Sequence, residues 1–533
     1  MELRRAGTNW GALMRRTLER LDALGARILF PKGDAAPELR CFVVFLLGHV
    51  AAWTLYAWLS HNNLSSSADL TEAYAWGREF EWGYHKHPPL SAWIAAAWFE
   101  LMPRSDWAYF LLAALIVAIG YAGVWALVGL LETGPRRLVS VISLEFSPIY
   151  GFLAIRFNAN SVLLALWPWA TWAFLRAVRD PTLLNGALLG LALAAALLAK
   201  YYSLVLIIGM LAALLVGENR WRLLTSPAMA GAVAAGALAL APHLVWLVQS
   251  DFAPIRYADD QTANSLGQFF GYLIKFPLAQ LLYVAPIVAV AALALPKPER
   301  IVSKSLFAWA SVDDDRRRIL ALGIVPFLAT MALGVVTFSQ LSTIWGIPLW
   351  FLTGWILLSS PGIAAHEVNA PRIAALVVLF WAVLIAIAPA VNLASTVLRP
   401  GRAPLPLKET ALAATSAWRE ATGGRPLRLV GGDDIFAPAT VFYSKDDPSW
   451  YDVAAPAFTP WAGPDRTARE GVAVLCPLQD RLCIQQTRQR LGPDLSEREI
   501  TAAKRAWWGR LPAHTVRVLM RLPDRSADAP PAR

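Results

Sequence analysis

Long runs of apolar residues dominate the chain, and short polar segments separate them. The runs are roughly 18 to 25 residues long, the length that a helix needs to cross a hydrocarbon core about 30 Å thick. A soluble protein would carry its apolar residues in short amphipathic stripes instead. The pattern predicts about eleven transmembrane helices, at residues 40–59, 106–131, 137–153, 160–178, 184–199, 201–216, 227–249, 270–295, 318–337, 343–360 and 373–394.

The longest polar interruption before the end of the predicted spans is residues 60–105, the first loop. Its start is too polar to span a membrane, and aromatic residues are spread through all of it. Tryptophans suit the headgroup zone, where a ring can lie half in water and half in lipid. We therefore expect the loop to lie along the membrane surface, with a surface helix over 69–80. The tryptophans in question are Trp76, Trp82, Trp93, Trp98 and Trp107.

After about residue 398 the apolar runs stop, and the proline-rich segment RPGRAPLPLKE reads as a linker. Beyond it, ALAATSAWREATG has helical spacing, whereas LRLVGG and VAVLCPL read as short buried strands. The stretch SEREITAAKRAWWGRL begins with a capping-box pattern from Ser496 to Glu499, which predicts a helix.

The predicted fold is thus an all-α polytopic membrane domain with surface-lying first-loop helices, followed by a small α/β domain. The membrane domain is expected at 40–397 and the α/β domain at 398–533. Residues 1–39 form a basic amphipathic segment that lacks the apolar core of a signal peptide, so we expect it to be retained.

Composition agrees with a lipid environment. Of 533 residues, 56% are hydrophobic and 16% are charged, whereas about a quarter of a soluble domain is charged. The net charge of +10 would suggest a nucleic-acid partner for a soluble protein. Here the basic residues occupy alternate loops, so the charge indicates membrane topology and we expect no nucleic-acid partner. The same pattern predicts a cytoplasmic N-terminus and an external C-terminal domain. The basic clusters are Arg4, Arg5, Arg15, Arg16, Arg136, Arg137, Arg176, Arg179, Arg220, Arg222, Lys297, Arg300, Lys304, Arg316 and Arg317.

The chain has three cysteines, too few for a disulfide scaffold. Cys41 begins a predicted span. Cys476 and Cys483 flank a short turn in the domain expected outside the cytoplasm, where disulfides form. The sequence therefore predicts a local disulfide, and two unpaired buried thiols are the alternative.

The residues best suited to chemistry lie in the first loop. Asp69 and Glu72 are three apart, so on a helix they share a face and can provide a general base, a cation ligand, or both. The alternative is solvated surface. Against it stands the neighbouring His85-Lys86-His87 cluster, because carboxylates beside cations at headgroup depth suit a phosphate-bearing lipid substrate.

Two later clusters are also expected on the outer side. Arg156 can bind phosphate with both arms of its guanidinium, and Asn158 and Asn160 can hydrogen-bond sugar hydroxyls. A snorkelling arginine and two helix-capping asparagines would look the same. Lys200 stands alone between two apolar spans, which favours a function, although it could merely mark the end of a span.

These residues carry a resemblance to a known family. Asp69, Glu72 and Tyr74, followed by Gly83-Tyr84, HPPL at 87–90 and Trp93, resemble the first-loop motif of fold-C polyprenyl-phosphate-sugar glycosyltransferases. That group includes the lipid A aminoarabinose transferase and the protein O-mannosyltransferases. Lys200-Tyr201 and the order of many helices followed by an outer soluble domain are similar too.

The chain departs from that pattern at two places. The aminoarabinose-transferase pattern has a lysine directly before the double proline, where this chain has His87 with Lys86 beside it. Many relatives have an aspartate in the segment that reads Phe157-Asn158-Ala159-Asn160 here. Both variants look more like the branch that decorates lipopolysaccharide with sugars such as galacturonic acid.

The resemblance implies an inverting transfer of a sugar from a polyprenyl-phosphate donor to lipid A or lipopolysaccharide, at the periplasmic face of the bacterial inner membrane. Asp69 would act as the base and Glu72 as its partner or a cation ligand, with His87 as a second ligand if a divalent cation is used. Donor-phosphate contacts are expected from Lys86, His87, Arg156 and Lys200, and other substrate contacts from Tyr74, Tyr84, His85, Asn158, Asn160 and Tyr201.

Two other functions remain open at this point. One is transfer to a protein acceptor, as in the O-mannosyltransferases. The other is transport or flipping of a lipid-linked sugar, which also uses many helices with sparse intramembrane charge. The absence of an evident internal repeat, and polar groups that gather outside the membrane rather than at its middle, argue against transport.

Overall fold

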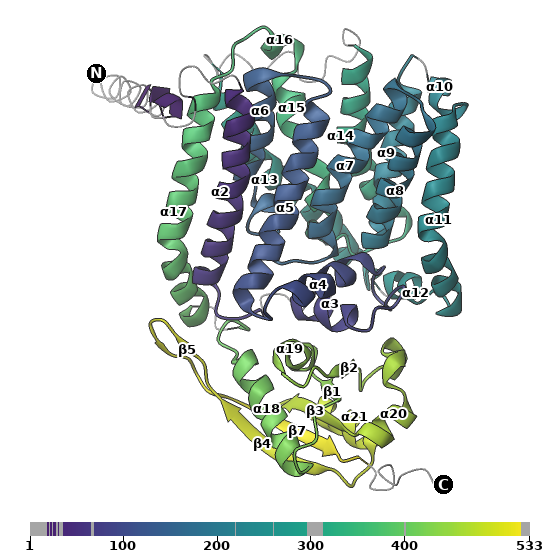
Figure 1. Ribbon diagram of the computed structural model, residues 1–533, viewed down its shortest axis with the longest axis vertical. Helices are drawn as coiled ribbons and strands as arrows, with labels where there is room; N and C mark the ends of the chain where they lie inside the picture. The colour runs from purple at the N-terminus through teal and green to yellow at the C-terminus, as the bar shows by residue number, and fades with distance from the viewer. Residues whose placement is uncertain are drawn as a thin grey trace. The chain divides into compact units, whose positions relative to one another are not determined.

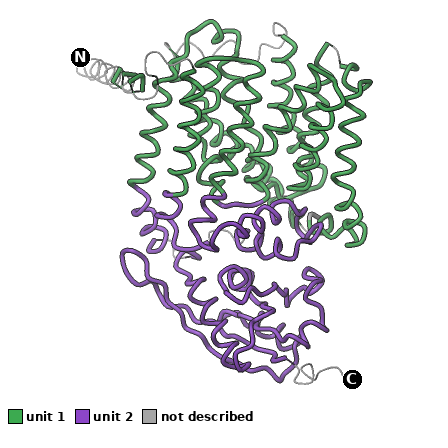
Figure 2. The backbone as a smooth tube through the Cα atoms, viewed as in Figure 1, with its two compact units in different colours: residues 1–54, 113–155, 159–386 green, residues 55–112, 156–158, 387–533 purple. Residues whose placement is uncertain are grey.

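The computed structural model of the protein describes residues 36–64, 69–218, 220–259, 261–295, 313–398 and 401–523, together with 19–20, 22–23, 25–27 and 30. The chain divides into two compact units (Figure 2). The helical unit comprises residues 1–54, 113–155 and 159–386, and the loop–sheet unit comprises 55–112, 156–158 and 387–533. Most of the basic N-terminal segment, and the expected cluster of Lys297, Arg300 and Lys304, lie outside the described residues.

Long helices pack side by side in the helical unit, with α7 against α8, α8 against α11, and α9 against α14 (Figure 1). Because their sequences are apolar over many turns, these helices bury one side in the unit and leave another for lipid. Its helices are α2 (Pro37–Ser60), α5 (Asp106–Val128), α6 (Gly134–Ile142), η1 (Ser143–Phe146), η2 (Pro148–Tyr150), α7 (Ala159–Arg179), α8 (Leu183–Ala199), η3 (Tyr201–Ser203), α9 (Leu204–Leu215), α10 (Arg220–Leu224), α11 (Pro227–Gln249), α12 (Ala253–Asp259), α13 (Leu266–Leu293), α14 (Asp314–Val336), η5 (Thr343–Trp350), α15 (Thr353–Leu358), α16 (Pro361–Ala364) and α17 (Ala370–Val397).

Seven of the helices among the described residues are long and apolar enough to cross a membrane: α2, α5, α7, α11, α13, α14 and α17. These seven correspond to seven of the roughly eleven predicted spans, and the other four predicted spans form shorter elements. The predicted span 137–153 breaks after α6 into two 3-10 helices, and Pro148, which lacks an N–H, begins the second. The predicted span 343–360 is likewise a 3-10 helix containing Pro348, followed by the short α15. Hydropathy counts apolar length but does not register such interruptions.

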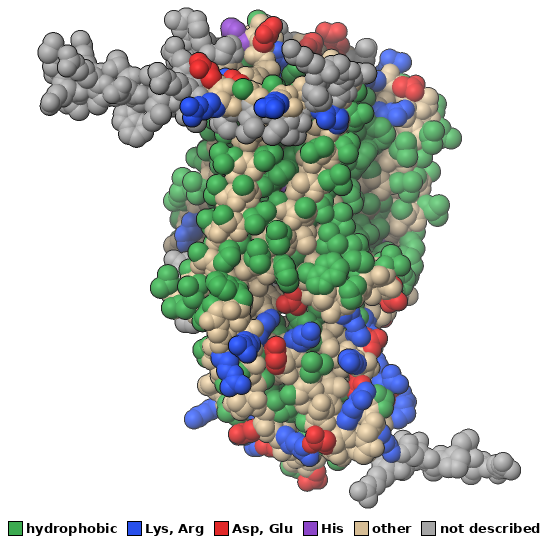
Figure 3. All heavy atoms as spheres, turned by 60° about the vertical axis from the view of Figure 1, so that its left-hand side comes forward, with side chains coloured by type: hydrophobic (Ala, Val, Ile, Leu, Met, Phe, Trp, Pro, Cys, Tyr) green, Lys and Arg blue, Asp and Glu red, His purple; other side chains and the backbone are tan. Residues whose placement is uncertain are grey.

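The other two predicted spans are helical where expected but shorter than the seven long helices. Helix α8 has 17 residues and α9 has 12, and the 3-10 turn η3 separates them. The exterior of the long helices is apolar, as a surface in contact with lipid requires, and Figure 3 shows hydrophobic side chains covering much of it. Exposed examples are Leu47, Val233, Leu238, Leu282, Leu328 and Val378.

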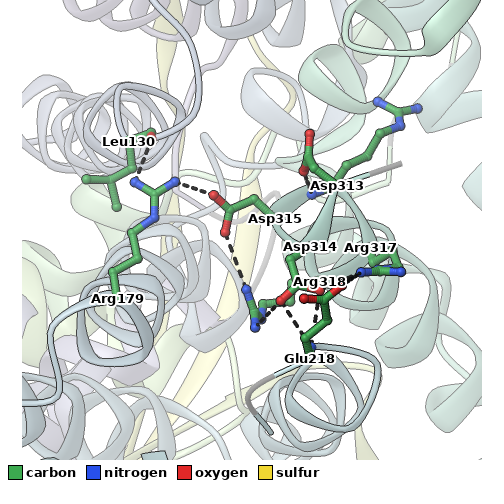
Figure 4. A network of polar contacts seen from close by, with 9 residues as sticks. Leu130, Arg179, Glu218, Asp313, Asp314, Asp315, Arg317 and Arg318 are labelled. Carbon is green, nitrogen blue, oxygen red and sulfur yellow. Dashed lines mark hydrogen bonds and ion pairs between the residues drawn. The ribbon is translucent and has the colours of Figure 1, made fainter. Parts of the chain in front are cut away.

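Charged residues tie together one end of the helical unit (Figure 4). Arg179, at the end of α7, pairs with Asp315 at 2.5 Å, and Arg318 pairs with Asp314 at 2.7 Å at the start of α14. The carboxylate of Asp314 also accepts from the backbone N–H of Glu218, which follows α9, at 3.1 Å. Three segments that the sequence assigns to the cytoplasmic side thus lie together.

The loop–sheet unit contains two helices from the first loop, α3 (Asp69–Gly77) and α4 (Leu90–Leu101). The expected surface helix over 69–80 therefore ends three residues early. Gly77 permits α3 and α4 to come close, because a Cβ at this position would collide with the backbone carbonyl of Ala92. Helix α3 in turn packs against α19 (Phe436–Tyr443) of the C-terminal segment.

A five-stranded mixed sheet in the order β2-β1-β3-β7-β4 forms the center of the C-terminal segment. Strands β1, β2 and β3 are parallel, and β7 is antiparallel to β3 and β4. Alternate residues of β3 pack with α21 on one face, and α18 and α19 also contact the sheet. The elements are α18 (Leu407–Ala421), β1 (Leu429–Gly432), α19, β2 (Ser449–Tyr451), η6 (Pro456–Phe458), η7 (Pro460–Ala462), α20 (Pro464–Glu470), β3 (Val472–Pro477), α21 (Arg481–Leu491), β4 (Ser496–Ala502), β5 (Arg505–Ala506), β6 (Gly509–Arg510) and β7 (His514–Arg521).

The helix and the two strands predicted before residue 480 form where expected, but the helix predicted from the Ser496 and Glu499 capping pattern does not. That stretch is strand β4, paired with β7 from Ser496↔Met520 to Ala502↔His514. The cross-strand ladder satisfies its backbone, and this tertiary pairing overrides the local pattern.

The structure joins Cys476 of β3 to Cys483 of α21 by a disulfide, the pairing expected from the sequence, with their Cα atoms 5.7 Å apart.

Candidate active site

The start of α3 brings two carboxylates to one lysine. The Lys86 ammonium lies 3.0 Å from Oε2 of Glu72 and 3.5 Å from Oδ1 of Asp69. The two acids converge because positions i and i+3 share one face of a helix, and the turn before Pro88-Pro89 returns Lys86 to that face. Asp69 opens α3, where the helix dipole favours negative charge.

The environments of the two carboxylates differ. The Glu72 side chain is 13% exposed and that of Asp69 is 32% exposed. Burial raises the pKa of Glu72 to about 7, and the nearby Asp69 and Asp434 carboxylates add to the rise that Lys86 opposes. A carboxyl group with a pKa close to neutrality can exchange a proton during a reaction at physiological pH. Asp69 is the carboxylate more open to a substrate.

Asn158 completes this cluster, since its side-chain amide donates to Oδ2 of Asp69 at 3.4 Å. The segment that was expected to bind sugar hydroxyls thus also orients the predicted base. Arg156, two residues earlier, is exposed in the same unit and acts electrostatically on His61. It is therefore accessible to an anionic ligand.

The remaining predicted residues of the first loop differ in accessibility. Tyr84 is 1% exposed and donates its hydroxyl to the Trp76 carbonyl at 2.8 Å, a contact within the loop. Tyr74 is also buried, with its ring 5.3 Å from that of Phe442. Both positions were expected to contact substrate, and their burial argues against that role.

The two histidines of the cluster also make contacts within the unit. The His85 ring stacks on Phe458 at 4.0 Å, and burial lowers the pKa of His85 to about 4, which keeps it neutral at physiological pH. The His87 ring lies edge-on to Trp76, 6.2 Å away. Among the described residues, no group of three or more His, Cys, Asp or Glu side chains could hold a metal ion. The proposed metal ligands Glu72 and His87 thus have no third side-chain ligand within that set.

The sequence interpretation missed one acidic residue, Asp434, in the turn between β1 and α19. Partial desolvation and the adjacent Asp433 raise the pKa of Asp434, whereas Lys86 lowers it. Lys86 therefore acts on carboxylates from both the first loop and the sheet. The signal was a pair of acids after two glycines at a strand end, a common place for functional side chains.

A second polar cluster lies in the helical unit around Lys200, which ends α8. Its ammonium donates to Oδ1 of Asn160 at 2.6 Å and lies 5.5 Å from the center of the Trp345 ring. The next residue, Tyr201, hydrogen-bonds through its hydroxyl to Nε2 of His243 at 2.8 Å. The structure thus brings together Lys200, Asn160 and Tyr201, and adds Trp345 and His243, which the sequence did not single out.

The site's acids and cations, and the motif that carries them, are those expected of glycosyltransferases of the fold-C type, and sequence comparison supports that class. Residues 86–246 match the family described as dolichyl-phosphate-mannose-protein mannosyltransferase. The chain is 26% identical over 313 residues to the lipopolysaccharide core galacturonosyltransferase RgtB of Rhizobium johnstonii. This alignment covers 54% of the chain and 59% of that relative, so it spans about three fifths of the relative's length.

Two crystal structures of ArnT from Cupriavidus metallidurans are also similar to the chain. The structure bound to undecaprenyl phosphate is 13% identical in sequence, and the superposition has a TM-score of 0.42. It covers 93% of this chain and 100% of the ArnT chain. The apo structure is 12% identical, covers 92% and 98%, and has a TM-score of 0.43.

The raised pKa of Glu72 predicts a pH dependence of stability. Because the pKa is about 7 in the folded protein and 4.5 for the exposed group, the folded state holds this proton more tightly. The corresponding stability is fully present below about pH 4.5 and is lost as the pH rises to about 7. Relative to Glu72→Gln, the wild type should lose on the order of 3 kcal/mol between these limits. Thermal unfolding in detergent at pH 5 and pH 7.5 measures the difference.

The matched control is Glu100→Gln, at an exposed position of the neighbouring helix α4. Its stability difference from the wild type should be the same at both pH values. Parallel pH profiles for Glu72→Gln and the wild type would contradict the assignment of this proton to Glu72.

Proposed function

We propose that the protein is a membrane glycosyltransferase that moves a sugar from a polyprenyl-phosphate donor to lipopolysaccharide or its lipid A, with inversion at the anomeric carbon. The observation that carries the proposal is the convergence of Asp69, Glu72 and Lys86 at the start of α3. The description of the matched family names a dolichyl-phosphate sugar, which supports a polyprenyl-phosphate donor. The relative is described as a lipopolysaccharide core galacturonosyltransferase, which supports a lipopolysaccharide acceptor.

The chemistry follows from the charges. The acceptor hydroxyl gives its proton to the Asp69 carboxylate, and its oxygen attacks the anomeric carbon of the donor. The bond from that carbon to the phosphate oxygen breaks, and the electron pair leaves with the polyprenyl phosphate. Positive charge from Lys86 and Arg156 stabilises this developing anion. Glu72 holds Lys86 in place through their 3.0 Å hydrogen bond. Because the pKa of Glu72 is about 7, the Glu72 carboxyl group can itself gain or lose a proton during the reaction.

The cluster around Lys200 is a separate candidate for phosphate binding in the helical unit. Its ammonium supplies positive charge beside the Asn160 amide and the Trp345 ring, which suits an anionic group. We place the reaction at the periplasmic face of the bacterial inner membrane, with the N-terminus in the cytoplasm, because the basic loops alternate in that sense. A divalent cation here would have only Glu72 and His87 as side-chain ligands among the described residues, so the proposed reaction assigns no step to it.

The proposal predicts a defined chemical loss in cells. A deletion strain should lack one sugar on its lipid A or core oligosaccharide, and mass spectrometry should show the corresponding mass decrease. The wild-type gene should restore the mass, and a gene encoding Lys86→Met should restore little of it. Lipopolysaccharide of unchanged mass in the deletion strain would contradict the proposed acceptor.

A protein acceptor is the second candidate, because the matched family is described as a protein mannosyltransferase. It predicts unchanged lipopolysaccharide and the loss of glycosylated periplasmic proteins in the same strain. A transporter of lipid-linked sugars would instead leave the purified protein unable to transfer any sugar to an acceptor in detergent.

A further inference from the structure

The C-terminal sheet has a hollow that the transfer site does not use. It has a volume of about 580 Å³ and lies along α21 and β7. Sites for small ligands commonly have volumes of about 300–1,000 Å³. Its lining consists of three arginines, two glutamines and two aliphatic residues: Arg481, Arg488, Arg517, Gln485, Gln489, Leu478 and Ile484.

Among the residues that the structure describes, the charges in this hollow leave one guanidinium without an ion-pair partner. Arg488 pairs with Glu497 at 2.6 Å, and Arg517 pairs with Glu499 at 2.8 Å, both carboxylates coming from β4. The Arg481 side chain has no hydrogen bond or ion pair with any residue that the structure describes. Three arginines against two glutamates leave a local charge of about +1, which suits a ligand with one anionic group.

The uncharged part of the lining suits a sugar. The side-chain amides of Gln485 and Gln489 have no partner among the described residues, and each can donate and accept hydrogen bonds with hydroxyl groups. A second hollow of about 300 Å³ shares Gln489 and adds Gln486 and Arg490. Two hollows that share one residue can accommodate neighbouring sugar units of a chain.

The disulfide and the helix cap fix the position of this surface. Cys483, two residues after Arg481, is bonded to Cys476 of β3, and Asp480 accepts from the Cys483 backbone N–H at 2.9 Å. The first turn of α21 therefore cannot shift far relative to the sheet, so the guanidinium of Arg481 is presented from a rigid support.

We infer that this hollow binds an anionic saccharide, held through its carboxylate or phosphate by Arg481 and through its hydroxyls by Gln485 and Gln489. The inference rests on the proposed function, because the saccharide would belong to the acceptor. The sheet would then select acceptors that carry a negative charge and hold them for transfer.

The test uses the full chain in detergent micelles and isothermal titration with three probes: glucose 1-phosphate, galacturonic acid and neutral galactose. The wild type should bind at least one of the anionic sugars and not galactose, and the better binder identifies phosphate or carboxylate as the recognised group. Arg481→Gln should weaken that binding at least about tenfold, as the loss of a charged hydrogen bond does. Gln485→Leu should weaken it without changing the preference for an anion.

The control is Arg469→Gln, an exposed arginine on α20 whose side chain lines neither hollow. It should bind like the wild type. No binding of either anionic sugar, equal binding of galactose, or wild-type affinity in Arg481→Gln would each overturn the inference.

A transfer assay separates this inference from the proposed function. With an anionic acceptor, Arg481→Gln should raise the KM for acceptor about tenfold and leave kcat unchanged. If the KM of Arg481→Gln were unchanged, the hollow would have no role in acceptor binding. Sugar transfer by the wild type in the same assay would still support the proposed function. A wild type that transfers no sugar at all would refute the proposed function, and the titration would still decide whether the hollow binds anions.

Discussion

Asp69→Asn should slow sugar transfer by at least about 10²-fold, because it removes a general base and keeps the volume and most hydrogen bonds of the side chain. In the wild type the Asn158 amide donates to Oδ2 of Asp69. In Asp69→Asn this contact is lost whenever the new NH₂ group faces Asn158, which adds to the loss of rate. The measurement is single-turnover transfer from a purified polyprenyl-phosphate sugar in detergent, with each variant first shown to be folded.

The matched control is Glu72→Gln. Glu72 contacts the same ammonium but is more buried, so its loss should appear mainly in the pH profile and in the apparent donor affinity. If Asp69→Asn transferred at the wild-type rate while Glu72→Gln lost 10²-fold, the base would be Glu72. If both variants were as active as the wild type, α3 would not hold the base at all.

Glu145→Leu should strongly destabilise the helical unit. The Glu145 carboxylate is fully buried and accepts from Nδ1 of His49 at 2.8 Å, Nε1 of Trp53 at 2.8 Å, the Tyr121 hydroxyl at 2.7 Å and Nε1 of Trp381 at 2.5 Å. Leucine would leave four buried donors without an acceptor. The loss of a buried charged partner costs about 3–5 kcal/mol, so the variant should aggregate or unfold at a much lower temperature.

Thermal unfolding of the detergent-solubilised protein measures this effect, with Glu132→Gln as the control. Glu132 is partly exposed and pairs with Arg136 at 3.4 Å, so its replacement should change stability by less than about 1 kcal/mol. Glu145→Gln should fall between the two, since its amide keeps one acceptor oxygen. Equal melting temperatures for Glu145→Leu and Glu132→Gln would show that the buried network does not hold the helices together.

Much of the site was predictable because its information is local. The i, i+3 spacing of Asp69 and Glu72 defines a common helix face, and Lys86 is only 14 residues from Glu72 along the chain. Asn160 and Lys200 were found separately, but their 2.6 Å hydrogen bond joins positions 40 residues apart. Burial was not predictable, so Tyr74 and Tyr84 were assigned to substrate although they pack inside the loop–sheet unit.

Asp434 and Glu145 show the opposite case. Asp434 influences the site only because α19, which follows it, packs on α3, and the sequence around Asp434 does not predict that packing. Glu145 lies in a stretch that hydropathy assigned to a membrane span, and its four donors come from three other helices. Such partners are set by the packing of helices that are distant along the chain.

Local patterns were enough to predict a membrane protein, the positions of the seven long helices and the loop that carries the acid pair, because apolar length and helical spacing are local properties. Only the folded chain shows that two further apolar runs break at Pro148 and near Pro348, and that the segment from Ser496 pairs as a strand. It also decided that the carboxylates of Asp69 and Glu72 share Lys86. The physical reason is that a backbone adopts whichever hydrogen-bond partners the folded chain supplies, and those partners lie far away in sequence.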